Sequence, residues 1–150
     1  MGDGDGWTGC ALGHRHWGRH GSAGLLLLAP RPAGRAVLLQ HRSPVCHHGG
    51  TWGLPGGARD SHETAVEAAL RETAEEVAVD LRGLTVVGEA LVDDHGGWSY
   101  TTVVAELPDA RRVATRGWES VDVGWVDEDD VEARPLHPGL AAAWPRLRGR

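Results

Sequence analysis

The segment from His62 to Val77 has the strongest helix pattern in this 150-residue sequence. Its apolar positions, spaced four and three residues apart, are Val66, Leu70, Thr73 and Val77. Asp60 or Ser61 is expected to cap the first turn, because short polar side chains accept hydrogen bonds from the free backbone N–H groups there. The spacing therefore predicts an amphipathic helix with one apolar stripe packed against the rest of the chain.

Apolar runs on both sides of this helix are bounded by Gly, Pro and Asp residues, a pattern typical of strands. The runs predicted to form strands are Ser22–Leu28, Arg35–Gln40, Val86–Val92, Ser99–Leu107 and Asp122–Val126. A turn is expected over Asp93–Gly97. A short helix is expected after Asp127 or Asp129, and a C-terminal helix should begin at Pro138 and end near Trp144-Pro145. Mixed strands with two or three helices indicate an α/β or α+β fold.

The length and charge of the chain exclude several classes of protein. A mass of 16.0 kDa predicts one domain, and a net charge of −6 argues against binding nucleic-acid polymers through a basic surface. The longest apolar run, Ala23–Ala29, is far shorter than the roughly 20 residues of a membrane helix. Cys10 and Cys46 are expected to be reduced thiols of a cytoplasmic protein. Residues 1–20, rich in Gly, His and Arg, should form a flexible arm before a domain over residues 21–148.

Three glutamates lie close together on the predicted helix. At roughly 100° per residue, Glu72, Glu75 and Glu76 fall within an arc of about 100°, on the side opposite the apolar stripe. The small residues near this acidic side are Ala65, Ala68 and Ala69. Carboxylates at such spacing repel one another, and a divalent cation such as Mg²⁺ would turn that repulsion into binding. The alternative is a solvated acidic face that binds no metal.

The loop before the helix strengthens the metal interpretation. Its paired glycines, Gly56 and Gly57, allow backbone carbonyl groups to approach an ion. From there a motif runs through Gly57, Glu63, Arg71, Glu72, Glu75 and Glu76. This array, over residues 57–79, resembles the Nudix box, which has a glycine, a glutamate, an Arg-Glu pair and a Glu-Glu pair at the same spacings.

Two positions depart from the Nudix pattern. Thr73 stands where the box has an apolar residue, and Ala78 replaces its last glycine. Without that glycine, the helix is expected to run on to Asp80 before it ends. Neither change touches a residue that the motif assigns to chemistry.

The resemblance implies a fold, an activity and a set of ligands. The fold would be an α/β/α sandwich with a mixed sheet and the loop-helix-loop of the box. Nudix enzymes hydrolyse a nucleoside diphosphate linked to another group, and they use Mg²⁺ or Mn²⁺. The metal ligands implied by the resemblance are Glu72, Glu75, Glu76 and the backbone carbonyl of Gly56. Glu76 would be the acid nearest the attacking water. The structural residues that it implies are Gly57, Glu63 and Arg71.

Three residues outside the box are further candidates. Arg42 ends the second predicted strand, where MutT-like members place an arginine on a phosphate; the alternative is a solvated strand-end arginine. Trp52 either packs in the core and loop or offers a platform on which a base stacks. Glu119, six residues before Trp125, resembles a carboxylate that acts as a metal or water partner in many members; the alternative is a solvated loop acid.

The resemblance favours hydrolysis of a phosphoanhydride in a (deoxy)nucleoside triphosphate such as an oxidised dGTP. Alternatives are ADP-ribose or dinucleotide polyphosphates, a Nudix module that only binds a nucleotide, and an isomerase of isoprenoid diphosphates. The complete set of box glutamates argues against the binding module. The loops Arg42–Gly50 and Asp93–Trp98 are expected to decide the substrate. A nucleotide-type small molecule is the expected partner, without a membrane or a nucleic-acid polymer, and a homodimer is left open.

Overall fold

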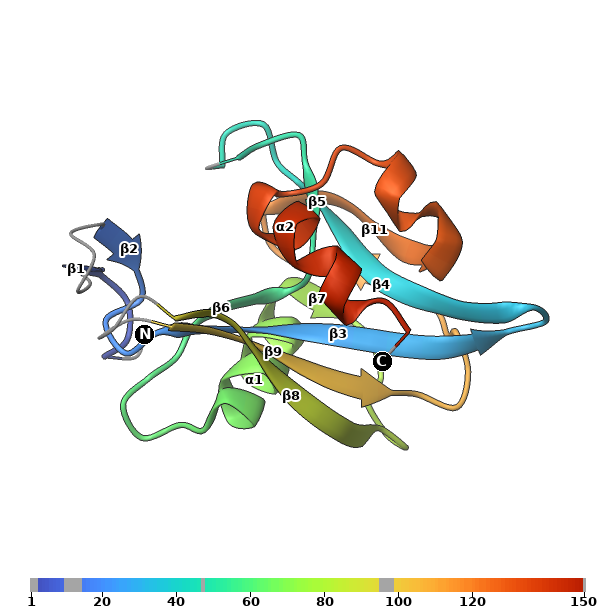
Figure 1. The fold of residues 1–150 in the computed structure, drawn as a ribbon, viewed down its shortest axis with the longest axis horizontal. Helices are drawn as coiled ribbons and strands as arrows, with labels where there is room; N and C mark the ends of the chain where they lie inside the picture. Colours follow the sequence, from blue (N-terminus) through green and yellow to red (C-terminus); the bar gives the residue numbers. More distant parts are fainter. Residues whose placement is uncertain (1–2, 10–14, 47, 95–98, 150) are drawn as a thin grey trace.

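A mixed seven-stranded sheet forms the centre of the molecule, in a computed structural model that describes residues 3–9, 15–46, 48–94 and 99–149 (Figure 1). In sheet order, the main strands are β11 (Ser120–Asp127), β4 (Gly34–Arg42), β3 (Ser22–Arg31), β9 (Ser99–Glu106) and β8 (Thr85–Asp94). Two short strands, β5 (Trp52–Gly53) and β6 (Gly56–Ala58), pair with β4 and β3. Strands β3 and β9 run parallel, and the other pairs are antiparallel. The five predicted strands are confirmed, whereas residues 95–97 of the predicted turn lie outside the described residues.

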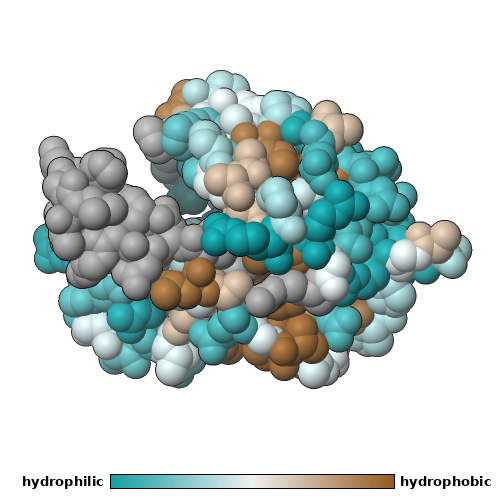
Figure 2. Space-filling view, viewed as in Figure 1, coloured by the Kyte–Doolittle hydropathy of each residue, from teal (hydrophilic) through white to brown (hydrophobic). Residues whose placement is uncertain are grey.

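Helices cover both faces of the sheet (Figure 1). The helical elements are α1 (Ala65–Glu76), the 3₁₀ helix η1 (Glu128–Ala133) and α2 (Pro138–Leu147). Successive side chains of a strand point to opposite faces, so Leu25 and Leu27 of β3 pack in one core cluster with α1, while Leu26 and Leu28 pack in another with α2. The fold is therefore the expected α/β/α sandwich. The face seen in Figure 1 is mainly hydrophilic, with apolar residues in separate patches (Figure 2). No helix in the described part of the chain is both long and apolar enough to cross a membrane.

Helix α1 starts later than predicted. Its N-cap is Thr64, which accepts a hydrogen bond from the backbone N–H of Glu67, while the Glu67 carboxylate accepts one from the N–H of Thr64. This reciprocal capping box satisfies two free donors at once. Asp60 has an acid at the same spacing, Glu63, whose carboxylate accepts from the Asp60 N–H at 2.9 Å. Asp60 is instead part of the loop before the helix, where its side chain accepts a hydrogen bond from Gly4.

Helix α1 also ends earlier than predicted. Val77 is extended (φ −130°, ψ 128°), and Val77–Ala78 form the short strand β7, which pairs with β10 (Ala114–Thr115). The expectation of a helix that continues to Asp80 is therefore wrong. Because Ala78 sits in a strand, its position needs no left-handed glycine to end the helix.

The buried face of α1 agrees only in part with the predicted one: Thr73 and Val77 are buried as expected. Ala68 and Ala69 are fully buried against the sheet, and Glu76 is only 6% exposed, whereas Val66 and Leu70 are half-buried at the edge of the core. One end of the acidic side, at Glu76, thus turns toward the sheet, whereas Glu75 stays exposed. Small alanine side chains let the helix approach closely enough to bury a glutamate.

The first residues contain regular structure that the sequence did not predict. Strands β1 (Trp7–Gly9) and β2 (Arg15–Trp17) form an antiparallel pair. The backbone N–H of Gly4 donates to the Asp60 carboxylate at 2.9 Å, and Asp3 accepts from the N–H of Ser61 at 2.8 Å. The predicted arm is thereby attached to the loop before α1, while its flexibility stays a prediction.

The C-terminal helices follow the sequence closely. Asp127 precedes η1, and Pro138 is the first residue of α2, as expected. Helix α2 includes Pro145 and ends at Leu147, slightly beyond the predicted end. Trp144 is fully buried and packs α2 onto the sheet.

Candidate active site

The loop before α1 reaches the helix through Gly57. Strand β6 pairs with the start of β3, with Gly56 opposite Gly24, so the loop is held at the sheet. A Cβ atom at position 57 would lie 2.5 Å from the carboxyl carbon of Glu72 and 2.7 and 2.8 Å from its two oxygens. The Glu72 carboxylate therefore rests directly on the backbone of Gly57, and no other residue fits there without moving it.

Glu72 and Glu76 bring two carboxyl groups together beneath this loop. Gln40 of β4 donates from Nε2 to Oε1 of Glu76 at 2.7 Å, and Ser120 donates to the other end of the same amide at 3.0 Å. Burial, followed by the neighbouring Glu72 carboxyl, raises the pKa of Glu76 to about 9. Burial also raises the pKa of Glu72. Two acids with raised pKa values in contact indicate a site that favours an added positive charge.

An unpartnered oxygen supports the same conclusion. Oε2 of Glu76 is buried and has no hydrogen-bond partner among the described residues. Leaving a buried acceptor unsatisfied costs about 1–3 kcal/mol, and more when the group is charged. Carboxylate oxygens suit hard divalent cations, so Glu72 and Glu76 fit a bound Mg²⁺ or Mn²⁺.

Glu75 lies differently from the other two predicted ligands. Its side chain is 57% exposed, and its carboxylate accepts from Nη1 of Arg71 at 3.3 Å. The structure thus brings Glu72 and Glu76 together and leaves Glu75 at the rim of the cluster. The roles of Glu75 and of the Gly56 carbonyl as metal ligands stay predictions.

Arg71 joins the loop to the helix. Its Nε and Nη2 donate to the two carboxylate oxygens of Glu63 at 2.7 and 2.9 Å, and Nη2 also donates to the carbonyl of Ala58 at 3.0 Å. Nη1 reaches Glu72 at 3.0 Å. These hydrogen bonds lower the pKa of Glu63 and raise that of Arg71. The geometry matches the predicted structural pair, in which a planar guanidinium holds a carboxylate by two bonds.

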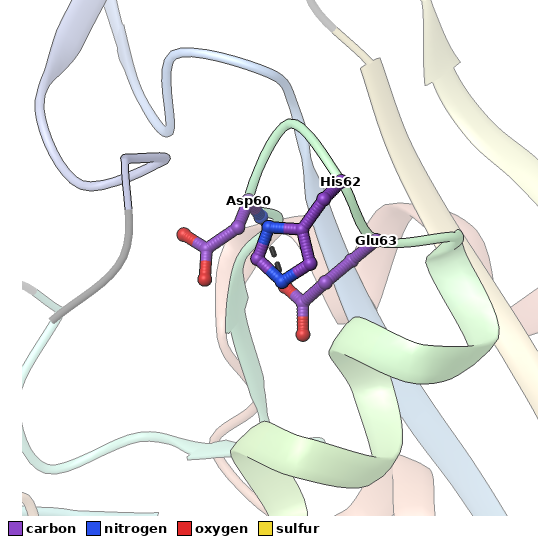
Figure 3. Close-up of side chains that lie close together, drawn as sticks. All are labelled: Asp60, His62 and Glu63. Carbon is purple, nitrogen blue, oxygen red and sulfur yellow. Dashed lines mark hydrogen bonds between the residues drawn. The ribbon is translucent and has the colours of Figure 1, made fainter.

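A second acidic group lies beside this pair. Asp60, His62 and Glu63 offer ligand atoms that all lie within 4.8 Å of one another (Figure 3). The two carboxylates of this group already face a cation. Arg71 bonds to Glu63, and its Nη2 lies 3.7 Å from Oδ2 of Asp60. This group is therefore held together by an arginine and needs no metal.

Glu119 and Arg42 lie at the same end of the sheet as Glu76. The charge of Glu119 contributes to the raised pKa of Glu76, so this exposed acid is close to the carboxylate cluster. Arg42, the last residue of β4, is paired in register with Ser120, the residue after Glu119. The structure therefore places Arg42 and Glu119, two of the three candidates outside the box, near the C-terminal end of α1, while their contacts with a substrate stay predictions.

Tyr100 is a neighbour of the site that the sequence analysis missed. Its pKa is raised to about 12 by burial and by Glu76, and Arg42 opposes the shift, so the phenol stays neutral. A Cβ at Gly24 would lie 2.0 Å from the phenol oxygen. The signal in the sequence was the glycine that interrupts the apolar run of β3, since it leaves room for this hydroxyl.

Trp52 packs against the protein itself. Its ring stacks on His41, with centroids 4.6 Å apart and planes 6° apart, and the Arg134 guanidinium lies 4.7 Å from the ring centre. The half-buried side chain also contacts the core cluster under α2. Of the two interpretations offered for Trp52, these contacts support packing.

Comparison with known proteins identifies the family. The family model described as NUDIX domain matches residues 18–147. A Mycobacterium tuberculosis H37Rv protein named "Putative 8-oxo-dGTP diphosphatase 3" is 51% identical over 153 residues, which cover 98% of this chain and 70% of that protein. A Bifidobacterium longum protein, "Nucleoside triphosphate pyrophosphatase/Nudix hydrolase fusion protein", is 41% identical, covering 98% of this chain and 31% of its own length.

Solved structures agree. The crystal structure of the Nudix hydrolase RenU from M. smegmatis has a TM-score of 0.91 and 49% identity, covering 97% of this chain and 93% of its own. The NUDIX domain of Shewanella oneidensis NrtR, solved with ADP ribose, has a TM-score of 0.61 and 27% identity, covering 88% and 90%. The box residues, the sandwich fold and these relatives together show that the chain belongs to the Nudix hydrolase family.

Proposed function

We propose that this Nudix hydrolase cleaves a phosphoanhydride bond in a (deoxy)nucleoside triphosphate, such as an oxidised dGTP, with Mg²⁺ or Mn²⁺. The observation that carries the proposal is the pair of Glu72 and the buried Glu76, one oxygen of which has no hydrogen-bond partner in the described part of the chain. The name of the M. tuberculosis relative supports an oxidised dGTP as the first substrate to test.

The glutamates of α1 are the metal ligands in this proposal. Glu72, Glu75 and Glu76 would hold the divalent cation together with the backbone carbonyl of Gly56. A cation bound there would neutralise phosphate charge and lower the pKa of a bound water. Gln40 fixes Glu76 through Oε1 and leaves Oε2 for the cation. The protein thus prepares the position of the negative charges before the ligand arrives.

Residues outside the box would handle the substrate. Arg42 offers a planar set of donors to a phosphate, which suits a phosphate oxygen better than a single N–H group. Glu119 lies close enough to Glu76 to influence its pKa, and would orient the attacking water or accept its proton. Arg71 acts indirectly, because it holds the loop and Glu72 in place.

The test is hydrolysis across a substrate panel. The panel contains dGTP, 8-oxo-dGTP, the other dNTPs, ADP-ribose and a dinucleotide polyphosphate, each with Mg²⁺, with Mn²⁺ or with EDTA. We expect pyrophosphate release from a nucleoside triphosphate that requires the metal. Glu76→Gln should reduce kcat by about 10³-fold or more, the size of effect seen when a key electrostatic group is removed.

Glu67→Gln provides the matched control. Glu67 is an exposed glutamate on the same helix, and glutamine can replace it in the capping box. The Glu67→Gln variant should therefore hydrolyse the substrate at the wild-type rate. Hydrolysis of ADP-ribose in preference to every triphosphate would reject the proposed substrate, and no turnover of any substrate with metal would reject the enzymatic proposal.

A further inference from the structure

Trp118 differs from the other tryptophans whose side chains the structure describes. Trp144 of α2 is buried in the core, and Trp52 packs on His41. Trp125 is half-buried and donates from Nε1 to the carbonyl of Arg111 at 2.7 Å. Trp118 is 68% exposed. Covering this aromatic surface would be favourable, so the exposed indole is available to a flat or apolar ligand.

The loop that carries Trp118 lies at the end of α1. The backbone N–H of Arg116 donates to the carbonyl of Glu76 at 2.9 Å, and the Arg116 side chain donates to the carbonyl of Ala74. On the other side of Trp118, Ser120 bonds to Gln40, the amide that holds Glu76. Hydrogen bonds on both sides of Trp118 thus hold its loop at the end of α1, next to the carboxylate cluster.

A second loop meets the first one at Glu119. The N–H of Ser43 donates to the carbonyl of Glu119 at 2.8 Å, and the thiol of Cys46 lies 3.5 Å from the same oxygen. Val45, between these two residues, is 80% exposed. Two loops joined by hydrogen bonds therefore each present an exposed apolar side chain near Glu119, an acid whose charge acts on Glu76.

We infer that Trp118 is the platform on which the base of the nucleotide stacks, with Val45 on the adjoining loop adding apolar contact. The inference rests on the proposed function, because it takes the phosphates to lie at the carboxylates. Trp118 directly precedes Glu119, so a nucleotide bound by its phosphates can extend its base over the indole. Bases stack on aromatic side chains through faces that every base has, and the platform would favour nucleotides over base-free phosphates.

Equilibrium binding tests this role without turnover. We would titrate wild type, Trp118→Ala and Trp118→Phe with α,β-methylene-dGTP and with inorganic tripolyphosphate, in Ca²⁺, by calorimetry. Trp118→Ala should weaken nucleotide binding about tenfold or more, as expected for one lost base–aromatic stack. Trp118→Phe should stay within about threefold of wild type. Tripolyphosphate should bind all three proteins equally, because it has no base.

A matched control and a spectroscopic readout complete the test. Leu91→Ala removes a similarly exposed apolar side chain from the edge strand β8 and should leave nucleotide binding unchanged. Nucleotide should change the tryptophan fluorescence of wild type, and this change should be lost in Trp118→Phe. Thermal unfolding of each variant shows whether the fold is kept.

The outcomes separate this inference from the proposed function. Wild type that hydrolyses nucleoside triphosphates while Trp118→Ala binds them normally would overturn the inference alone. Equal weakening of tripolyphosphate and nucleotide would also overturn it, since the loss would then not concern the base. Nucleotide binding that depends on Trp118 without any hydrolysis would support the platform and contradict the proposed function.

Discussion

The two ends of helix α1 each hold buried acidic side chains, and they hold them in opposite ways. Before the helix, Glu63 and Asp60 face the guanidinium of Arg71, and the pKa of Glu63 is lowered. At its C-terminal end, Glu76 faces an amide and another carboxyl group, and its pKa is raised to about 9. The carboxylates of Glu63 and Asp60 are paired with an arginine of the protein itself. Glu76 lies beside another acid and would be stabilised by an added cation.

This contrast shows how one residue type serves two purposes in one motif. A buried carboxylate with its own arginine contributes to holding a loop in place, because both charges are paired and hydrogen-bonded. A buried carboxylate without a cation stores an unfavourable interaction that an added ion can relieve. The protein therefore separates a structural cluster from a binding cluster by placing Arg71 between them, where it reaches Glu63 fully and Glu72 by one nitrogen.

Removing Arg71 should leave Glu63 and Asp60 without a cation, as Glu76 would be before a metal binds. Arg71→Met would leave Glu63 and Asp60 buried without a cation, which should lower the free energy of unfolding by about 3 kcal/mol, at the low end for buried pairs because Arg71 is partly exposed. Chemical denaturation would measure the loss. Arg71→Lys keeps the charge without the planar pair of donors and should lose less. Equal stability of wild type and Arg71→Met would contradict the structural role.

Displacing the Glu72 carboxylate from Gly57 should reduce the activity that depends on Glu72 and Glu76. Gly57→Ala places a methyl group 2.5 Å from the Glu72 carboxyl carbon, so the carboxylate must move, and kcat should fall about 100-fold, as for a misplaced catalytic group. Steady-state kinetics would show the change. Gly124→Ala is the matched control, because a Cβ there would meet nothing within 4 Å. Similar losses in both variants would argue against a specific contact at Gly57.

Adding Mg²⁺ should pair the Glu72 and Glu76 carboxylates with a cation, as Arg71 pairs those of Glu63 and Asp60, and should stabilise the fold. Mg²⁺ at ten times its dissociation constant should stabilise the fold by about 1.4 kcal/mol, since ligands that bind only the folded state raise its stability. A thermal melt with increasing MgCl₂ would show a rise in Tm of about 3–6 °C for a chain of this size. The rise should be much smaller in Glu76→Gln. An equal rise in both proteins would place the cation elsewhere.

Acid should weaken the first cluster selectively, with the smallest effect of the four. Glu63 has a folded-state pKa below its ordinary value of 4.5, so its contribution to stability is present above pH 4.5 and is lost as pH falls through the lowered value. Urea unfolding at several values below pH 4.5 should show a steeper loss in wild type than in Glu63→Gln. Parallel curves for the two proteins would mean that Glu63 gains nothing from Arg71.

The sequence predicted the elements and the motif, because both depend on local spacing. The strands follow from apolar runs, and Glu63, Arg71, Glu72 and Glu76 were identified by their intervals along the chain. The burial of Glu76 was not predicted, since helix periodicity assigns charged residues to the solvent side. In this protein the alanines at positions 68 and 69 carry the packing, and they have too little apolar surface to dominate the pattern.

Contacts between segments that are far apart in the chain could not be predicted from local sequence patterns. Tyr100 lies 76 positions after the glycine that makes room for it, and nothing in the local sequence joins the two. The N-cap at Thr64 was missed for a different reason. Asp60, Ser61 and Thr64 all have capping side chains, and the choice depends on Glu67 and on the hydrogen bonds that Asp60 makes elsewhere.

The hydrogen bonds that join the loop after β4 to Glu119 have a consequence for how such a protein can evolve. Ser43 and Cys46 both contact the Glu119 carbonyl, so lengthening either loop would break the contact unless the other loop changed to restore it. New specificities should therefore arise through paired changes in these two segments. A directed-evolution library that randomises both loops together should yield more functional variants than two libraries that each randomise one.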